Sequence, residues 1–556
     1  RVMGPRVERV LIAGLATLYV CALVYEAWRL GVTVDEPAHV LSAHLYWKGQ
    51  DRLQPRDMPP LIKIAGGWPS LFIPPVIPTD GGGWKQQHEW PAAQDMMARM
   101  DGPRIQKLFF VSRLALLIFP VGTAILLWWW GRQIFSPVAG LLIATAFILS
   151  PTAMGHGALF KNDHAATFGY LLFWYQAWRY WKEPTLGRGA VLGFALLVAV
   201  LSKLSMMVLL AVAPVIVVAR WRRPAAVLGV TGAIVYVGLI AACQFETRLL
   251  DPEALERLDR DERIPDAFLR ASAVFQYFPA PAPIWDGLVQ VLESNGGTNQ
   301  IYFAGKVYEG GHPLYFLVAL GVKMASASLI LVALGAILAA RRALRGKLEA
   351  ADGFWLFPAL LYIGLASMST LQLGVRLVLP AFPFLLLMGG GAIRWLLEGR
   401  RRALALAGLF VWLAWRSVDI YPRGLTFFNR WSGGPEHGLE YLADSNLDWG
   451  QALPDLAEYM VKNQIGRIRL SYFGTDKVFR FFRDDQVEMI PPPWGADLVE
   501  GEYLNPDPGL YAISASLLPG QLFAPEYRDY YRVFRKMEPI ARVGEAIYVY
   551  RVGAGG

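Results

Sequence analysis

The sequence is poor in cysteine and in charge. It has 2 cysteines in 556 residues, Cys21 and Cys243, both within apolar runs. This excludes a disulfide-rich secreted scaffold, leaves room for one disulfide between distant spans, and provides no Cys-x-x-Cys pair for zinc. Charged residues make up only 18% of the chain, against 54% hydrophobic residues and a mean hydropathy of +0.34. Such a composition excludes an ordinary soluble protein and predicts a polytopic α-helical membrane protein.

Long apolar runs are the main feature of the sequence. The first run has no small-residue cleavage site after it, so we expect it to remain as a signal anchor rather than to be removed. Runs of roughly 17–25 residues predict about eleven membrane spans. They lie near residues 10–30, 108–130, 137–155, 164–181, 189–203, 204–219, 225–243, 312–340, 354–373, 377–397 and 402–420.

The net charge of +8 is carried largely by short loops between these runs. Basic residues recur in alternate loops, as the positive-inside rule requires of cytoplasmic loops, so we do not interpret them as a nucleic-acid surface. With the N-terminus cytoplasmic, an odd number of spans places the C-terminal segment outside. The basic loop residues are Arg132, Arg179, Lys182, Arg188, Arg220, Arg222, Arg223, Arg341, Arg342, Arg345, Lys347, Arg400, Arg401 and Arg402.

Two domains follow from the change in composition after the last span. Residues 1–425 are expected to form a transmembrane catalytic domain with two long outer loops, 31–107 and 244–311. The first loop is expected to hold short amphipathic helices in the plane of the interface. Residues 430–556 are expected to form a small extracytoplasmic α/β domain. Its expected elements are a helix over Leu439–Lys462 and strands over Ile468–Phe473, Leu510–Ser514 and Ala546–Arg551.

Three cations interrupt the otherwise weakly basic outer face. They are Lys161, Lys203 at the turn between the fifth and sixth runs, and Arg376 between the ninth and tenth. A lipid phosphate at the outer headgroup level requires such cations, and arginine adds a planar pair of donors. The alternative is that each side chain extends to lipid headgroups or pairs with a local carboxylate. For Arg376 we favour the functional interpretation.

Four carboxylates share this face: Asp35, Glu36, Asp57 and Asp163. Transfer of a sugar from a phosphate requires a base for the acceptor's proton, while cations or a divalent metal stabilise the leaving phosphate. One carboxylate could act as the base and another, such as Asp57, could hold a metal. The alternative is that Asp35 and Glu36 cap the helix starting at Pro37 and that Asp163 caps the fourth span.

Histidines give a weaker signal. Five of them fall near the outer face, but none forms a spaced pair of the His-Glu-x-x-His kind. We interpret them as structural or as facing the acceptor. They are His39, His44, His156, His164 and His312.

Several short motifs together resemble one enzyme family. In order along nearly the whole chain, they resemble the C superfamily of glycosyltransferases (the GT-C fold), specifically the bacterial family 39 enzymes. These phospholipid carrier-dependent glycosyltransferases are relatives of the protein O-mannosyltransferases and the lipid A aminoarabinose transferases. The matching pieces are Asp35–His39, Pro59–Lys63, Asn162-Asp163, Leu201–Lys203, Tyr302–Gly305, Gly374–Pro380 and Asp444–Gln451.

The resemblance implies a polyprenyl-phosphate sugar donor, transfer at the outer membrane face and inversion at the sugar. It assigns the base to Asp35 with Glu36 beside it, and a second acidic position to Asp163. Arg376 and Lys203 match the positions nearest the lipid phosphate. The family often has His or Lys before the Pro-Pro pair, where this chain has Met58. A donor or metal contact is therefore absent there or is supplied by a neighbour: Arg56, Asp57 or Lys63.

The remaining candidates are aromatic. Trp449, in the Asp448–Gln451 segment, is either an aromatic plug behind a helix cap, which we favour, or a platform that stacks on a sugar ring. Tyr302 and His39 are the other candidates for contacting the sugar or the acceptor.

The sequence thus predicts an inverting monosaccharide transferase of the bacterial cytoplasmic membrane, with a protein, lipid or glycan acceptor. The alternative is a transporter or flippase of lipid-linked sugars. A transporter is expected to show paired hydrophobic halves and polar residues at the midplane of broken helices, and the sequence shows neither.

Overall fold

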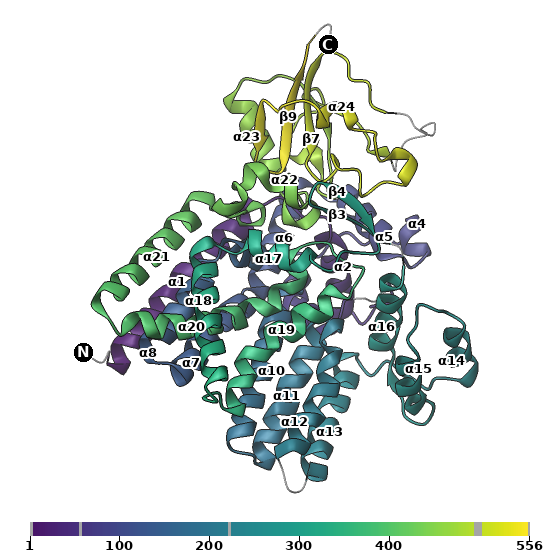
Figure 1. Cartoon of the computed structure of the whole chain (residues 1–556). Helices are drawn as coiled ribbons and strands as arrows, with labels where there is room; N and C mark the ends of the chain where they lie inside the picture. The colour runs from purple at the N-terminus through teal and green to yellow at the C-terminus, as the bar shows by residue number, and fades with distance from the viewer. Residues whose placement is uncertain (1–3, 55–57, 221–223, 298, 494–502, 554–556) are drawn as a thin grey trace.

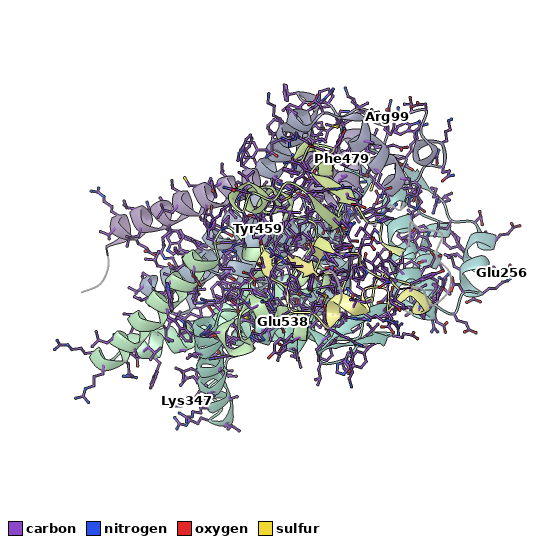
Figure 2. All side chains as sticks on the ribbon, turned by 90° about the horizontal axis from the view of Figure 1, so that it is seen from above. Arg99, Glu256, Lys347, Tyr459, Phe479 and Glu538 are labelled. Carbon is purple, nitrogen blue, oxygen red and sulfur yellow. The ribbon has the colours of Figure 1, made fainter. Side chains whose placement is uncertain are left out.

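The computed structural model describes residues 4–54, 58–220, 224–297, 299–493 and 503–553. Figure 1 shows a large helical body with a small sheet at one end, where the C-terminus lies. Seen from the sheet end, the helix that carries Glu256 and the loop that carries Lys347 extend beyond the sheet on two different sides (Figure 2).

The α-helices of the first half are α1 (Pro5–Arg29), α2 (Glu36–Trp47), α3 (Pro60–Gly67), α4 (Gly82–Lys85), α5 (Glu89–Arg99), α6 (Gly102–Leu116), α7 (Ile118–Ile134), α8 (Pro137–Ile148), α9 (Pro151–Gly157), α10 (Asp163–Lys182), α11 (Leu186–Ser202), α12 (Leu209–Arg220) and α13 (Pro224–Ala242). Those of the second half are α14 (Pro252–Asp259), α15 (Asp266–Ser272), α16 (Ala282–Asn295), α17 (Tyr315–Lys323), α18 (Ser326–Leu344), α19 (Gly353–Ser367), α20 (Phe382–Leu397), α21 (Arg400–Ile420), α22 (Gly438–Tyr441), α23 (Leu453–Lys462) and α24 (Arg532–Arg535).

The chain is a multi-pass membrane protein. Within the described residues, seven helices are long and apolar enough to cross a membrane, or eight if the bent pair α8–α9 is one span. That pair bends by 63°, where Ser150 caps the new helix and Pro151 begins it. All eleven predicted runs fall on helices, but several are shorter or more polar than an independent span requires.

Two further breaks between helices also have local causes. The run 312–340 is divided into α17 and α18, because Met324 and Ala325 take extended conformations. Between α11 and α12, Lys203 is extended (φ −159°, ψ 138°) and the short 3-10 helix Leu204–Val208 follows it. The predicted boundary at this lysine is therefore observed.

The first outer loop packs more deeply than predicted. Helix α2 was expected in the interface plane, yet every residue from Glu36 to Tyr46 is buried. Its apolar side chains join those of α5 and α6 in one core. Both faces of α2 therefore pack against protein rather than against lipid headgroups.

The C-terminal residues form a five-stranded sheet in the order β6-β5-β7-β9-β8. Strand β5 pairs in parallel with β6 and β7, while β9 is antiparallel to β7 and β8. The three predicted strands are confirmed as β5, β7 and β9. The strands of this sheet are β5 (Ile468–Ser471), β6 (Val487–Met489), β7 (Gly509–Ser514), β8 (Ala541–Val543) and β9 (Ile547–Val552).

Two small antiparallel pairs of strands lie outside this sheet. The pairs are β1 (Thr247–Arg248) with β2 (Ala280–Pro281), and β3 (Gln300–Phe303) with β4 (Lys306–Glu309).

The helix predicted over 439–462 was wrong in its middle. Asp444 has a positive φ of 58° and Gly450 one of 88°, so the chain between α22 and α23 is a folded loop.

Candidate active site

A cluster of charged side chains gathers where the helical body meets the C-terminal region. Asp35 follows α1, Lys161 lies in the loop before α10, and Arg376 lies in the 3-10 helix Val375–Ala381. Asp35 Oδ2 is 2.5 Å from Lys161 Nζ and 3.5 Å from Arg376 Nη1. Segments up to 341 residues apart therefore meet at one carboxylate, as their shared membrane face predicts.

Asp35 is held ionised by these neighbours. Burial alone raises the pKa of its carboxyl, but the charges of Lys161 and Arg376 outweigh burial and lower that pKa to about 2. Its side chain keeps 15% exposure, against 9% for Lys161 and 10% for Arg376. The cluster is thus mostly shielded but still reachable from outside.

Arg376 has unused donors. Its Nε donates to Ser445 Oγ at 3.1 Å, Nη1 makes only the 3.5 Å contact with Asp35, and Nη2 makes no hydrogen bond to any described residue. The residue before this helix, Gly374, has φ 140°, and a Cβ there would lie 2.3 Å from Ser445 Oγ. Glycine is therefore required for the turn that presents Arg376.

Trp449 forms one wall of the cluster. Its ring lies 4.3 Å from the Arg376 guanidinium and 5.6 Å from Lys161 Nζ, in the geometry of cation–π contacts. The ring is 2% exposed. This buried position fits the interpretation of Trp449 as an aromatic plug. Stacking on a sugar would require a ring face that Arg376 and Lys161 cover.

Lys203 and Asp163 form a second pair. Lys203 Nζ donates to Asp163 Oδ1 at 2.8 Å, and the charges of Arg376 and Lys161 also act on this carboxylate. Asp163 Oδ2 is buried and has no hydrogen-bond partner among the described residues. Asp163 begins α10, but no hydrogen bond between its side chain and a helix N–H is observed.

Glu36 has surroundings unlike those of Asp35. It is fully buried, and its two oxygens accept from Arg113 Nε (2.7 Å) and Nη2 (2.6 Å), from Phe160 N (2.8 Å) and from Thr33 N (2.9 Å) and Oγ1 (3.1 Å). Burial opposes ionisation, yet Arg113 and the N–H donors lower the pKa of Glu36. All its acceptor positions are thus used within the protein.

His39 contacts the cluster from α2. Its Nε2 lies 2.7 Å from Lys161 Nζ. Burial and the charge of Lys161 hold the pKa of His39 well below its usual range. The neutral ring therefore accepts from the ammonium through Nε2 and carries its proton on Nδ1, which is buried with no partner among the described residues.

Other predicted residues are not brought into this cluster. Lys63 Nζ pairs with Asp51 at 2.7 Å beside Cys243, and its side chain is only 4% exposed. Tyr302 donates to Leu439 O at 2.8 Å, on the β3–β4 side of the molecule. Asp57 and Arg56 lie outside the described residues.

The other histidines lie apart from the cluster, except one. His44 bonds Ser70, His164 bonds Ala153 O, and His312 stacks on Phe303. His156 packs edge-on against Trp449 with ring centroids 6.2 Å apart. Both cysteines are free.

Sequence reasoning assigned no role to two charged residues of the site. Arg113, 1% exposed within α6, pairs with Glu36. Asp444 faces the cluster, where burial and the charge of Asp35 raise its pKa to about 6 despite the opposing charge of Arg376. A lone arginine in an apolar run is itself a signal that a partner exists, but the sequence does not identify that partner.

The described part of the chain has no group of three or more His, Cys, Asp or Glu side chains that could hold a metal ion.

The chain matches no family model and no curated protein. Among solved structures it is similar to the crystal structure of ArnT from Cupriavidus metallidurans bound to undecaprenyl phosphate. That match covers 97% of both chains at 12% identity, with a TM-score of 0.45. The same protein in the apo state covers 97% of both chains at 13% identity, with a TM-score of 0.29. At such low identity and TM-score, neither likeness assigns a function to this chain.

Proposed function

We propose that the chain is an inverting glycosyltransferase that moves a monosaccharide from a polyprenyl-phosphate donor to a protein, lipid or glycan acceptor. One observation carries the proposal: Asp35 shares a shielded cluster with cations from separate segments, and Arg376 keeps an unused donor there. A base beside phosphate-binding cations is what this transfer requires. The family resemblance of the motifs supports the same reaction.

The donor phosphate is proposed to bind Arg376 and Lys161, with Lys203 nearby. The free Nη2 of Arg376 donates to a phosphate oxygen, and the long 3.5 Å contact of Nη1 with Asp35 is readily exchanged for a second bond to the phosphate. Charge-assisted pairs of this kind are the strongest hydrogen bonds in proteins. The lysines balance the charge of the departing polyprenyl phosphate.

Binding of the phosphate also prepares the base. In the free protein the cations hold the pKa of Asp35 at about 2, where a carboxylate is a weak base. A phosphate that neutralises those cations lets this pKa rise. The acceptor oxygen then attacks the anomeric carbon, its proton passes to Asp35, and the sugar–phosphate C–O bond breaks with both electrons on phosphate.

The remaining candidates receive supporting roles. Asp163, through its free Oδ2, and His39, through its free Nδ1–H, are proposed to orient the sugar or acceptor hydroxyls. Glu36 is proposed to position the 31–36 segment through Arg113 rather than to exchange protons. Trp449 is proposed to hold Arg376 in place. The contacts of Lys63 and Tyr302 support no role in the transfer.

The membrane location and orientation of the chain are inferred from the distribution of its basic residues. We propose a bacterial cytoplasmic membrane protein with a cytoplasmic N-terminus, because basic residues recur in the loops opposite the cluster. Residues 430–556 are then an extracytoplasmic α/β domain, and residues 1–425 form the transmembrane catalytic domain. The cluster faces outside, where the lipid-linked donor and the acceptor meet. No described feature favours the transporter alternative.

The test is sugar transfer from a panel of radiolabelled polyprenyl-phosphate sugars, using membranes that carry wild type, Asp35→Asn or Arg376→Ala. Each assay is run with and without EDTA, which decides the requirement for a divalent cation. We expect wild type to consume one donor. The rate of sugar transfer should fall at least about 100-fold in Asp35→Asn, the usual contribution of a general base, and by a similar factor in Arg376→Ala, which removes a donor to the leaving phosphate.

The matched controls are Asp485→Asn and Arg483→Ala, which remove an exposed ion pair whose side chains are 73% and 75% exposed. They are expected to retain full transfer. Full activity of Asp35→Asn at equal protein level would overturn the assignment of the base, and consumption of no donor by wild type would overturn the function.

A further inference from the structure

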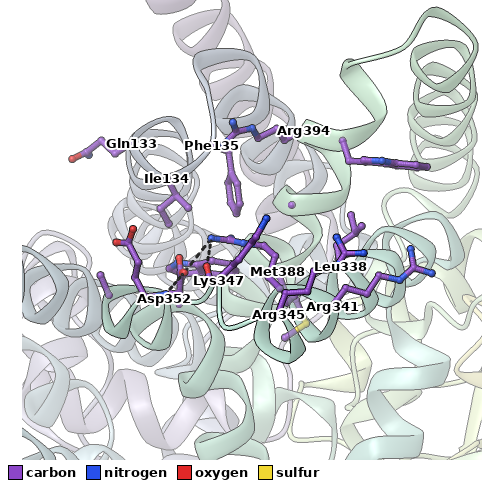
Figure 3. Close-up of a pocket in the computed structure, with 18 of the residues that line it drawn as sticks. Gln133, Ile134, Phe135, Leu338, Arg341, Arg345, Lys347, Asp352, Met388 and Arg394 are labelled. Carbon is purple, nitrogen blue, oxygen red and sulfur yellow. Dashed lines mark hydrogen bonds and ion pairs between the residues drawn. The ribbon is translucent and has the colours of Figure 1, made fainter.

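A polar cavity lies in another part of the membrane domain, away from the Asp35 cluster. It has a volume of about 760 Å³ and is lined by the ends of α7, α10, α18 and α20 and by residues of the loop after α18 (Figure 3). Cavities of roughly 300–1,000 Å³ are typical of sites for small ligands. None of the cluster residues around Asp35 lines it.

The cavity is on the opposite membrane boundary from the cluster. Helix α10 begins with Asp163, which pairs with Lys203 in the cluster, and ends with Lys182, which lines the cavity. Its 20 residues span about 30 Å at the rise of an α-helix, which is the thickness of the hydrocarbon core of a bilayer.

The lining is strongly basic. Its carboxylates are Glu349, Asp352 and Glu398. Its cations outnumber them and are Lys182, Arg341, Arg342, Arg345, Lys347 and Arg394. Only Arg342 is neutralised: it pairs with Asp352 at 3.3 Å and donates to Lys347 O at 3.2 Å, which orders the loop. Arg341, Arg345 and Arg394 form no ion pair with a described carboxylate.

The positive-inside rule explains why basic residues gather at this end, but it does not explain an ordered cavity. Buried tryptophans, Trp178 and Trp355, form part of its wall. Lys182 Nζ lies 3.9 Å from the Trp178 ring, and Trp355 packs edge-on against Phe135. The cations are thus set on a rigid aromatic frame rather than on a solvated loop alone.

The surroundings indicate an occupant with acyl chains. On the helices that present Arg341 and Arg394, apolar side chains face outward: Ile337 is 51% exposed and Leu344 89%, while Leu397 on α20 is 37% exposed. Lys347 lies at the edge of the molecule, as Figure 2 shows. The cavity therefore meets the lipid at headgroup level.

We infer that this cavity binds the phosphate headgroup of an anionic phospholipid from the leaflet opposite the Asp35 cluster. Arg341, Arg345 and Arg394 supply the unpaired donors, and the exposed faces of α18 and α20 receive the acyl chains. Basic pockets between transmembrane helices are suited to such headgroups. This inference is independent of the sugar-transfer reaction.

Native mass spectrometry of the full-length, delipidated protein in detergent tests it. The probes are dioleoylphosphatidylglycerol and, as a neutral lipid, dioleoylphosphatidylcholine. We expect the first phosphatidylglycerol to bind wild type more tightly than phosphatidylcholine does. Arg341→Gln/Arg394→Gln is expected to weaken it about 30-fold, from the attraction typical of two arginines near a membrane surface.

The control variant is Arg400→Gln/Arg401→Gln, which removes the same charge from the start of α21, outside the cavity lining. It is expected to keep the wild-type affinity. Three results would overturn the inference: unchanged binding by the cavity variant, an equal loss in the control, or displacement of the lipid by millimolar inorganic phosphate, which would identify a soluble anion instead.

Discussion

Glu36→Gln should destabilise the protein more than Asp35→Asn does, whereas Asp35→Asn should chiefly stop the chemistry, although the two carboxylates are adjacent. Glu36 and Arg113 are 0% and 1% exposed and are joined by two charge-assisted bonds. A glutamine keeps one acceptor oxygen, so its NH₂ group must face donors in place of the other. Arg113 then remains buried as a charge without its counter-ion.

The size of the effect follows from these contacts. Removing one partner of a buried ion pair costs about 3–5 kcal/mol. Arg113 retains its bonds to Ala27 O (2.8 Å), Leu30 O (3.0 Å) and Gly31 O (2.7 Å), which favours the lower part of that range. We therefore expect a loss of about 3 kcal/mol, seen as a clear fall in Tm.

The assay is thermal unfolding of detergent-purified protein, measured beside donor consumption. Asp35→Asn is the comparison variant, because the Asp35 side chain is 15% exposed whereas that of Glu36 is 0% exposed. Its fall in Tm is expected to be smaller than that of Glu36→Gln, and its kcat is expected to fall about 10²–10⁴-fold. Equal Tm values for wild type and Glu36→Gln, combined with complete loss of transfer, would refute the positioning role and make Glu36 a catalytic residue.

Three further predictions concern the surroundings of the cluster. Arg376→Lys keeps the charge but loses the paired donors and the stacking on Trp449, so kcat/KM for the donor should fall about 10–100-fold; steady-state kinetics within two-fold of wild type would contradict this. Gly374→Ala should cost about 1–3 kcal/mol through its positive φ and the clash with Ser445, whereas Gly364→Ala, where an added Cβ meets nothing within 4 Å, should be neutral in Tm and activity. Burial raises the pKa of Asp448 to about 7, so the folded state binds this proton more tightly than the unfolded state does. The free energy of unfolding should therefore fall by up to about 4 kcal/mol as the pH rises from about 4 to about 7. In Asp448→Asn this fall in Tm should be smaller, and parallel Tm–pH curves would contradict it.

The sequence predicts the meeting of Asp35, Lys161 and Arg376 because the topology predicted from the apolar runs places their loops on one face. Apolar runs fix which loops share a side, and few short-loop cations occur there, so each one is informative. The pairing of Lys203 with Asp163 follows the same logic. These features depend on the order of spans rather than on the detail of packing.

Other parts of the site depend on packing that no local pattern encodes. Arg113 and Glu36 are 77 residues apart, and nothing in either segment specifies the other. The apolar spacing of the loop between α22 and α23 predicts a helix, but the tertiary contacts of Trp449 outweigh that propensity. Burial of α2 is likewise set by covering segments rather than by its own sequence.

The C-terminal region builds the site rather than merely covering it. Gly31 N donates to Gln451 O at 3.0 Å, Val34 N to Trp449 O at 3.0 Å, and Val32 N to Asp476 Oδ2 at 2.8 Å. These bonds fix the backbone immediately before Asp35, and a Cβ at Gly31 would lie only 2.9 Å from Gln451 O. Because the same loop holds Arg376 through its aromatic ring, the proposed base and the proposed phosphate ligand share one support. Separation of the C-terminal region from the helices would therefore move both groups together, so the site exists only in the intact chain.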